Sequence, residues 1–267
     1  MQRWHKTSLV VVGAIVFSTV AIQASDIVRS IDGNMVGLAL DNGSICGPGA
    51  TEVYLGSGAL CVDLYEAAAS KDCADADPDN ETQTQNNVND VACHAVSEEG
   101  REPWRYVSLP QAQQLCARTG KRLPNNDEWY ALVSAMGDQT SCNTTGPGVR
   151  ATGAQQCTTY AGVYDMVGNL WEWVDGQVVD GQYNDRPVPG SGYVQLVDAD
   201  GVVLETGTKE REEYGGDYAT TDSVGIYGMV RGGFYGSEED AGLYAQNLSV
   251  PLNLKAPGVG FRCVRTI

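Results

Sequence analysis

Cysteines, histidines and carboxylates are the residues of this chain that could perform catalysis or bind a metal. The 267 residues include eight cysteines, two histidines and 34 Asp+Glu against 17 Lys+Arg. No two cysteines form a CxxC or CxxCH motif, which argues against zinc ribbons, thioredoxin-type redox sites and c-type haem. The formal charge of −17 excludes a nucleic-acid-binding surface, because phosphate backbones require clustered cations.

The N-terminus predicts export. Arg3 and Lys6 precede an apolar run over residues 8–22, and Ala24 offers a small residue at which cleavage can occur. The run is short for a membrane anchor, which needs about twenty residues, so a cleaved signal peptide over residues 1–24 is favoured. We therefore expect an extracytoplasmic mature chain, periplasmic or secreted, with no stable membrane span and with its cysteines in disulfides.

Two helices are predicted between residues 108 and 137. Ser108 with Gln111 and Asn125 with Glu128 form capping boxes; Gly120 supplies a left-handed end to the first helix, and Gly137 ends the second. Apolar residues recur at helical spacing after each box: Leu109, Ala112, Leu115 and Cys116, then Trp129, Leu132, Val133 and Met136.

The rest of the chain predicts short strands and loops. Residues 61–69 favour a strand that runs into a turn, residues 70–100 a polar loop, and residues 193–205 a hairpin turning at Asp198–Gly201. Trp171 and Trp173 alternate, so on a strand they share one face, which we expect to be core. These patterns indicate the α+β class.

Four segments carry a family resemblance. They are CVDLYEA (61–67), ARTGKRLPNNDEW (117–129), GVYDMVGNLWEW (162–173), and VRGGF (230–234) followed by GFRC (260–263). In this order they resemble the formylglycine-generating enzyme, or sulfatase-modifying factor, family. The resemblance implies a C-type-lectin-like fold, with two helices packed on short twisted antiparallel strands and long irregular loops. We expect this domain over residues 61–267, after an N-terminal extension at 25–60.

The resemblance also implies a calcium site. Family members bind Ca²⁺ through positions that correspond here to Asp165, the carbonyls of Gly168 and Leu170, and Glu172. Ca²⁺ prefers such oxygen ligands. The alternative is that Asp165 caps a turn while Glu172 pairs with a cation such as Arg231.

The catalytic position departs from the family pattern. The copper-dependent enzymes use two cysteines between RGG and GFR, but residues 235–259 contain neither cysteine nor histidine. Cu(I) needs soft ligands such as thiolates, so no copper is expected and no catalytic residue is assigned. The single histidine beyond the signal segment, His94, lies in a polar loop and is expected to be an ordinary solvated side chain.

The cysteines can be assigned to structural bridges. The family links the position of Cys116 to that of Cys263. The others fall into local pairs, Cys46–Cys61, Cys73–Cys93 and Cys142–Cys157, although sequence alone leaves other connectivities open.

Two functions remain. The first is a non-catalytic, exported, sulfatase-modifying-factor-like domain that binds a protein or glycan partner through Gly- and Tyr-rich loops at 176–228 and 234–258. Tyr235, Tyr244 and Asn247 are the candidate partner-binding residues, because tyrosine offers a large amphipathic contact area at low entropic cost. The alternative for these tyrosines is packing beneath the loops. The second function is a formylglycine-generating oxidoreductase acting on a cysteine of a sulfatase, which the missing cysteine pair disfavours.

Overall fold

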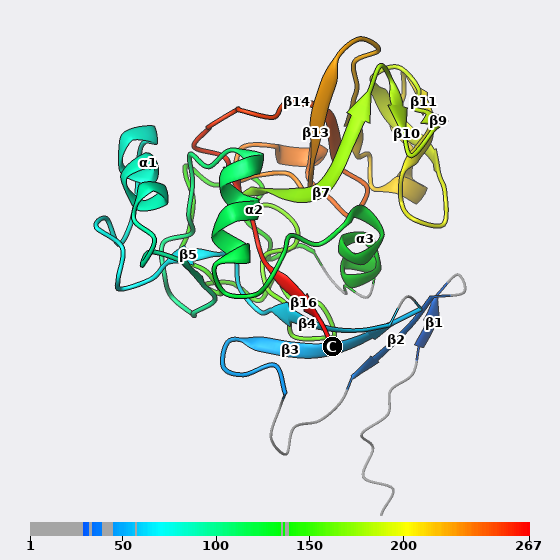
Figure 1. Cartoon of the computed structure of the whole chain (residues 1–267). Coiled ribbons are helices and arrows are strands. Elements are labelled where there is room, and N and C mark those ends of the chain that lie inside the picture. Colours follow the sequence, from blue (N-terminus) through cyan, green and yellow to red (C-terminus); the bar gives the residue numbers. More distant parts are fainter. Residues whose placement is uncertain (1–28, 32–33, 39–44, 57, 135, 137–138) are drawn as a thin grey trace, which may run out of the picture.

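The computed structural model describes residues 29–31, 34–38, 45–56, 58–134, 136 and 139–267 (Figure 1). The predicted signal peptide, residues 1–24, lies outside these ranges. Within them, no helix combines the length and the apolar character that crossing a membrane requires. The described chain is a mixture of helices and sheets, which confirms the α+β prediction.

A five-stranded antiparallel sheet joins the two ends of the described chain. Its order is β1-β2-β3-β4-β16. The strands are β1 (Arg29–Ile31), β2 (Asn34–Leu38), β3 (Ala50–Leu55), β4 (Gly58–Asp63) and β16 (Val264–Thr266). Since β16 pairs with β4, the terminal strand lies beside the first family-like segment, at the base of the molecule in Figure 1. Residues 25–60, the predicted extension, thus supply strands to this sheet.

A larger sheet carries the loops of interest. Its order is β11-β10-β12-β14-β13-β7-β8-β9, and β15 also pairs with β7. Most pairs are antiparallel, whereas β12–β14 and β15–β7 are parallel. The strands are β7 (Trp171–Val179), β8 (Gln182–Tyr183), β9 (Arg186–Pro187), β10 (Gly192–Val197), β11 (Val203–Gly207), β12 (Tyr218–Thr220), β13 (Ile226–Arg231), β14 (Gln246–Pro251) and β15 (Val259–Gly260). The predicted hairpin at 193–205 is confirmed by the antiparallel β10–β11 pair.

Both predicted helices and their N-terminal caps are confirmed, whereas Gly137 lies outside the described residues. The first is α2 (Leu109–Ala117), at whose start Ser108 N donates to Gln111 Oε1 at 3.0 Å. The second is α3 (Asn126–Ser134), where Glu128 N donates to Asn125 Oδ1 at 2.8 Å and Asn125 N donates back to Glu128 Oε2 at 2.9 Å. These reciprocal bonds satisfy amide groups that the first turn leaves unpaired.

The prediction of a loop throughout residues 70–100 is wrong. This segment contains α1 (Glu81–Asn89) and the short strand β6 (Ala95–Val96), which pairs with β5 (Ala68–Ala69) just before the segment. Asn80 caps α1 by accepting a hydrogen bond from Gln83 N at 3.0 Å. The helix is polar along most of its length, so its sequence lacks the apolar periodicity that marks α2 and α3. Among the described residues after Ser134, helical backbone is limited to the 3₁₀ turns η1 (Glu212–Tyr214) and η2 (Glu238–Asp240).

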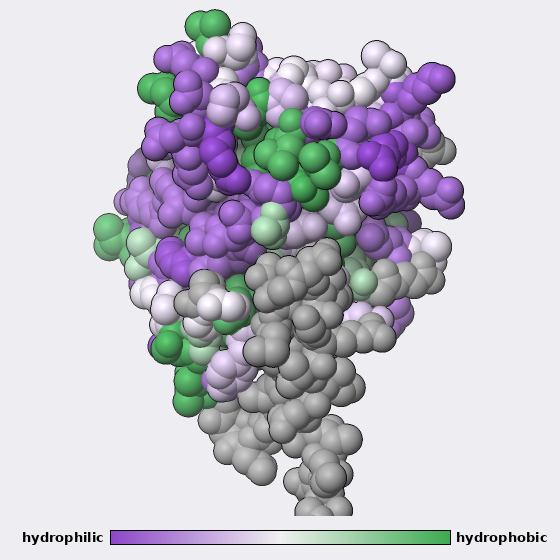
Figure 2. Space-filling view, turned by 90° about the vertical axis from the view of Figure 1, so that its right-hand side faces the viewer, coloured by the Kyte–Doolittle hydropathy of each residue, from purple (hydrophilic) through white to green (hydrophobic). Residues whose placement is uncertain are grey.

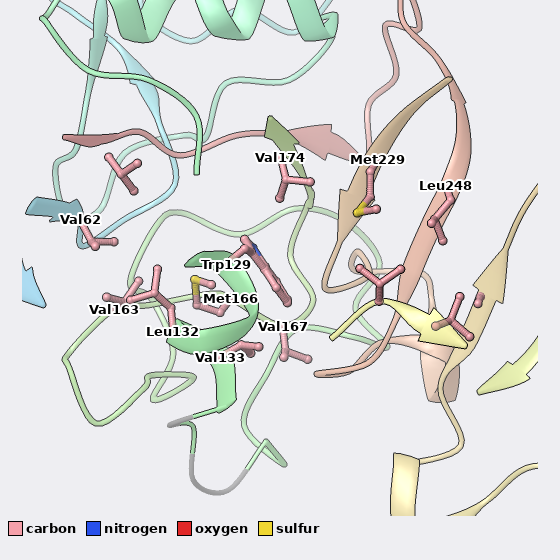
Figure 3. Close-up of a cluster of buried hydrophobic side chains, with 14 of the residues drawn as sticks. Val62, Trp129, Leu132, Val133, Val163, Met166, Val167, Val174, Met229 and Leu248 are labelled. Atoms are coloured by element: carbon pink, nitrogen blue, oxygen red, sulfur yellow. The ribbon is translucent and has the colours of Figure 1, made fainter. Parts of the chain in front are cut away.

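Two buried clusters lie on the central strands of the larger sheet. In the first, Trp129 and Leu132 of α3 pack with Val174, Met229 and Leu248, which converge in Figure 3. In the second, α2 contributes Leu109, Ala112 and Leu115, which pack with Trp173 and Val230. Trp171 is half-buried against this second cluster, so the shared core face of Trp171 and Trp173 is confirmed.

All eight cysteines are paired, as predicted. The bridges are Cys46–Cys61, Cys73–Cys93, Cys116–Cys263 and Cys142–Cys157. Cys116–Cys263 ties α2 to the chain end just before β16 across 147 residues of sequence, whereas the others close loops of 15 to 20 residues. The long bridge restricts the unfolded chain most strongly in the chain-entropy view.

Candidate functional site

The segment predicted to bind calcium is a tight turn that leads into β7. Asp165, Gly168 and Asn169 all have left-handed backbone, with φ of 58°, 72° and 56°. At Gly168 a β-carbon would lie 2.5 Å from the carbonyl oxygen of Asn143, so no larger residue fits without moving the backbone. The turn directs its polar groups into the protein, because Asp165, Asn169 and Glu172 are all buried.

Glu172 forms a buried ion pair. Arg262 Nε donates to its two oxygens at 2.8 and 2.9 Å, and Arg262 Nη2 donates to Oε1 at 2.5 Å. Trp129 Nε1 donates to Oε2 at 2.8 Å. Both side chains of the ion pair are completely buried. The cation beside Glu172 is therefore Arg262, whereas the sequence had suggested Arg231.

Asp165 closes the turn against a neighbouring loop. Its Oδ2 accepts a hydrogen bond from Gly153 N at 2.7 Å. Burial, as the largest cause, raises the pKa of this carboxyl to about 6, although the Gly153 hydrogen bond and Arg262 lower it. Asp165 thus caps the turn, as the alternative to a calcium site proposed, and it lies close enough to Arg262 to feel its charge.

Glu66 is a third buried carboxyl of this cluster, and sequence reasoning did not single it out. It accepts hydrogen bonds from Asn169 Nδ2 at 2.5 Å and from Leu170 N at 3.1 Å. Burial, followed by the charges of Asp165 and Glu172, raises its pKa well above the usual value. The signal was present in the first family-like segment, where Glu66 follows Tyr65.

The four family-like segments therefore meet in one place. Glu66 comes from the first, Trp129 from the second, Glu172 from the third and Arg262 from the fourth. Their side chains form one buried hydrogen-bonded group together with the 165–172 turn. Three carboxyl groups face a single guanidinium there, which leaves an excess of acid in a buried environment.

This excess of carboxyl groups would favour a bound cation, but several carboxylate oxygens of the predicted calcium ligands already accept hydrogen bonds from protein groups. Glu172 binds Arg262 and Trp129, and one Asp165 oxygen accepts from Gly153. In the part of the chain that the structure describes, no group of three or more His, Cys, Asp or Glu side chains is arranged to hold a metal. A calcium ion would thus bind through carbonyls as well as carboxylates, as the predicted ligand set requires.

Residues 235–259, the stretch in which the family resemblance implies catalytic cysteines, lie after β13. Arg231 of the RGG sequence is completely buried over the rings of Trp129 and Tyr130, at 5.0 and 5.9 Å. Its Nη1 and Nη2 donate to Gly201 O and Leu243 O, both at 3.3 Å, while Nε finds no hydrogen-bond partner among the described residues. Burial lowers the pKa of Arg231 to about 10. Arg231 thus fastens the hairpin turn and the loop after RGG to the core.

The three candidate partner-binding residues lie in different environments. Tyr235 is half-buried, with its ring 5.0 Å from that of Phe234. Tyr244 packs between Tyr214, at 5.0 Å, and Tyr130, at 6.1 Å. Asn247 lies half-exposed on β14, where its Oδ1 accepts from Ser249 N and Oγ, both at 3.0 Å. Tyr244 thus has the packing role that the alternative interpretation gave to most of the tyrosines.

Asp217 holds the loop that carries Tyr244, and sequence reasoning missed it. The carboxyl is buried and accepts a hydrogen bond from Tyr244 N at 2.6 Å. A β-carbon at Gly242 would come within 2.2 Å of it, so this contact needs glycine. Burial is the largest cause that raises the pKa of Asp217 to about 7. Nothing in the sequence near Asp217 marks it as buried.

Comparison with known proteins supports the resemblance. The sulfatase-modifying factor enzyme 1-like domain matches residues 148–267, the region that contains the last two of the four family-like segments. A curated relative, "Inactive C-alpha-formylglycine-generating enzyme 2" of Bos taurus, is 28% identical over 120 residues. That match covers 36% of this chain and 40% of the relative, so the chain spans well under half of its length.

Solved structures give weaker likenesses. The P3c variant of the Major Tropism Determinant has a TM-score of 0.47 at 17% identity, covering 86% of this chain and 56% of that one. PvdO from Pseudomonas aeruginosa has a TM-score of 0.45 at 14% identity, covering 88% of this chain and 92% of that one. Residues 148–267 are therefore similar to the sulfatase-modifying factor enzyme 1-like domain, as the motifs had indicated.

Proposed function

We propose that this chain is an exported, non-catalytic relative of the formylglycine-generating enzymes that binds a protein or glycan partner through its Gly- and Tyr-rich loops. The observation that carries the non-catalytic part is the state of the cysteines. All eight are in disulfides, and the stretch between RGG and GFR contains neither cysteine nor histidine. Without a thiolate or an imidazole there, the position lacks the ligands that Cu(I) requires.

The cattle relative supports the same conclusion, because its name describes it as inactive. Export is supported by the four disulfides, which are typical of proteins that fold outside the reducing cytosol. The proposed cleavage after Ala24 predicts that the mature protein begins at Ser25. N-terminal sequencing of exported protein tests this directly, and an intact N-terminus would contradict it.

Partner binding is supported by the construction of the loops. The RGG-to-GFR stretch is fixed at both ends, by Arg231 in the core and by the Cys116–Cys263 bridge. Between these ends, Tyr235 and Asn247 keep part of their surface exposed. A rigid scaffold that presents half-exposed tyrosine and amide groups is well suited to recognition.

The catalytic question has a direct assay. Oxidised and mildly reduced protein is incubated with Cu(I), oxygen and a Cys-x-Pro-x-Arg peptide, and the peptide is analysed for an aldehyde by mass spectrometry. We expect no aldehyde above a protein-free control. Aldehyde formation would refute the non-catalytic assignment and would favour an oxidoreductase acting on a sulfatase cysteine.

Partner binding is tested by retention on the immobilised mature chain. Extracytoplasmic proteins and a glycan array are applied to the wild type, to Tyr235→Ala with Asn247→Ala, and to a Tyr160→Ala control. Tyr160 is a suitable control because its side chain is 58% exposed in a different loop. The double variant is expected to lose the ligand and the control to retain it. Equal retention by all three proteins would contradict the proposal.

We also propose that Ca²⁺ binds the 165–172 turn, through the carboxylates of Asp165 and Glu172 and the carbonyls of Gly168 and Leu170. The buried acid excess around Arg262 supports this, because a divalent cation would neutralise it. The ion would supply structural charge neutralisation. Thermal melting in chelator and in millimolar Ca²⁺ should show a higher melting temperature with calcium, and a smaller shift in Asp165→Asn. Identical melting in both buffers would refute the site.

A further inference from the structure

One face of the β10–β12–β14 part of the larger sheet is left at the surface. Along these strands Val194, Ala219 and Leu248 point into the first core cluster and are completely buried. Side chains one position away point to the other face and are half-exposed: Tyr193, Tyr218, Thr220 and Asn247. We call these four residues the tyrosine face.

The strand register brings these residues side by side. Tyr193 pairs with Tyr218 across β10 and β12, and Thr220 pairs with Asn247 across β12 and β14. The two tyrosine rings meet edge to face, with centroids 5.3 Å apart and an interplanar angle of 85°. Asn247, predicted from the sequence as a partner-binding residue, is therefore continuous with an aromatic pair contributed by a distant part of the chain.

Carboxylates lie directly beside this aromatic pair. The Tyr193 hydroxyl donates a hydrogen bond to Glu210, and the charge of Asp240 also acts on Tyr193. The negative charge of Glu210 is the largest cause that raises the pKa of Tyr193, followed by burial. Glu210 belongs to the β11–β12 connection and Asp240 to η2, so acids approach the tyrosine face from two separate segments.

The surrounding charge is also negative. Residues 203–213 contain four acids (Glu205, Glu210, Glu212 and Glu213) against Lys209 and Arg211. Arg211 is already engaged, since it donates to Glu213 at 2.5 Å and lies 5.2 Å above the Tyr214 ring. On the face that Figure 2 displays, hydrophilic residues surround a compact apolar patch. The chain as a whole has a formal charge of −17.

We propose that the tyrosine face, with Glu210 and Asp240 beside it, binds a cationic segment of a partner protein and accommodates a Lys or Arg side chain. A cation placed against Tyr193 and Tyr218 gains attraction from the ring faces, and the neighbouring carboxylates pair with it. A neutral glycan could stack on the rings and donate hydroxyl groups to the acids, but it would gain no charge pairing from them. This inference rests on the proposed binding function, and it specifies that the partner is cationic and that it binds at the tyrosine face.

The test uses the mature, disulfide-bonded chain and a defined probe. Isothermal titration calorimetry measures binding of a peptide of about six arginines, and of a matched glutamate peptide, at an ionic strength of about 0.15 M to suppress long-range attraction. The variants are Tyr193→Ala with Tyr218→Ala, and Glu210→Gln. The matched controls are Tyr160→Ala and Glu99→Gln, which remove an exposed tyrosine and an exposed acid elsewhere.

The arginine peptide should bind the wild type, and each test variant should weaken that binding about tenfold, while both controls match the wild type. Unaltered circular dichroism of Glu210→Gln shows that its effect is local. Absence of binding, equal binding of the glutamate peptide, or equal weakening by Glu99→Gln would overturn the inference. If a glycan or an acidic protein is nevertheless retained through Tyr235 and Asn247, the proposed function stands and the cationic assignment alone fails.

Discussion

Replacing Asp217 with asparagine should remove a pH dependence that this buried carboxyl gives to the stability of the fold. Asp217 is 2% exposed and accepts a hydrogen bond from Tyr244 N. Burial raises its pKa from 3.8 to about 7. The folded state therefore retains a proton that the unfolded state has released, over the interval between these two values.

The sign and the size follow from linkage. Because the folded pKa is the higher one, the stabilising contribution of the protonated carboxyl is fully present below pH 3.8 and is lost as the pH rises through 7. Each pKa unit is worth about 1.36 kcal/mol, so the whole contribution is about 4 kcal/mol. About 2.7 kcal/mol of that loss falls between pH 5 and pH 8.

Urea unfolding of the oxidised protein at pH 5, 6, 7 and 8 measures this contribution. The free energy of unfolding of the wild type, relative to Asp217→Asn, should fall by about 2.7 kcal/mol across the series. Asp185→Asn, which changes an exposed carboxyl, should retain the pH dependence of the wild type. A difference between the wild type and Asp217→Asn that does not change with pH would refute the reasoning, whatever the absolute stability of the variant.

Three further predictions concern stability. Glu172→Gln should lower the free energy of unfolding by about 3–5 kcal/mol in urea, because it removes the one carboxylate that pairs directly with the buried Arg262. A loss below about 1 kcal/mol would contradict this. Gly201→Ala should lower the free energy of unfolding by about 2 kcal/mol or more, because Gly201 has a φ of +73° and its new β-carbon would lie 2.2 Å from a tyrosine ring. Gly190→Ala is the control: its β-carbon would meet nothing within 4 Å, so its stability should be nearly unchanged. Replacing Cys116 and Cys263 by serine should lower the free energy of unfolding by about 5 kcal/mol in the chain-entropy model, because the bridge closes a loop of 147 residues. Replacing Cys142 and Cys157, which close a loop of 15 residues, should lower it by about 3 kcal/mol. A lower melting temperature for the second variant than for the first would exclude loop length as the cause.

Local signals in the sequence predicted the elements that depend on local chemistry. The capping boxes at Ser108 and Asn125 predicted both helices, because each cap bonds residues only three positions apart. The turn at Asp198–Gly201 predicted the β10–β11 hairpin for the same reason. The short-range disulfides join cysteines that are neighbours in sequence, whereas Cys116–Cys263 came from the family resemblance.

Features that depend on distant segments were not predictable in this way. Arg262 lies 90 residues from Glu172, and Glu66 lies 104 from Leu170, so no spacing in the sequence links them. Asp217 is one acid among many until the fold buries it against the loop before β14. The helix α1 was missed for a different reason: its stability comes from caps and tertiary contacts of polar residues such as Thr84 and Asn87, which bind Arg105 O and Asp75 O.

The convergence of the four family-like segments gives them a structural role that requires no catalytic cysteine. Glu66, Trp129, Glu172 and Arg262 form one buried polar group, and removing one partner would leave the others unpaired in a low-dielectric interior. Their shared role in this chain is therefore in folding. The stretch between RGG and GFR contributes no side chain to that group. A match to the family motifs consequently identifies the scaffold, whereas the activity has to be argued from the residues of that stretch and of the tyrosine face.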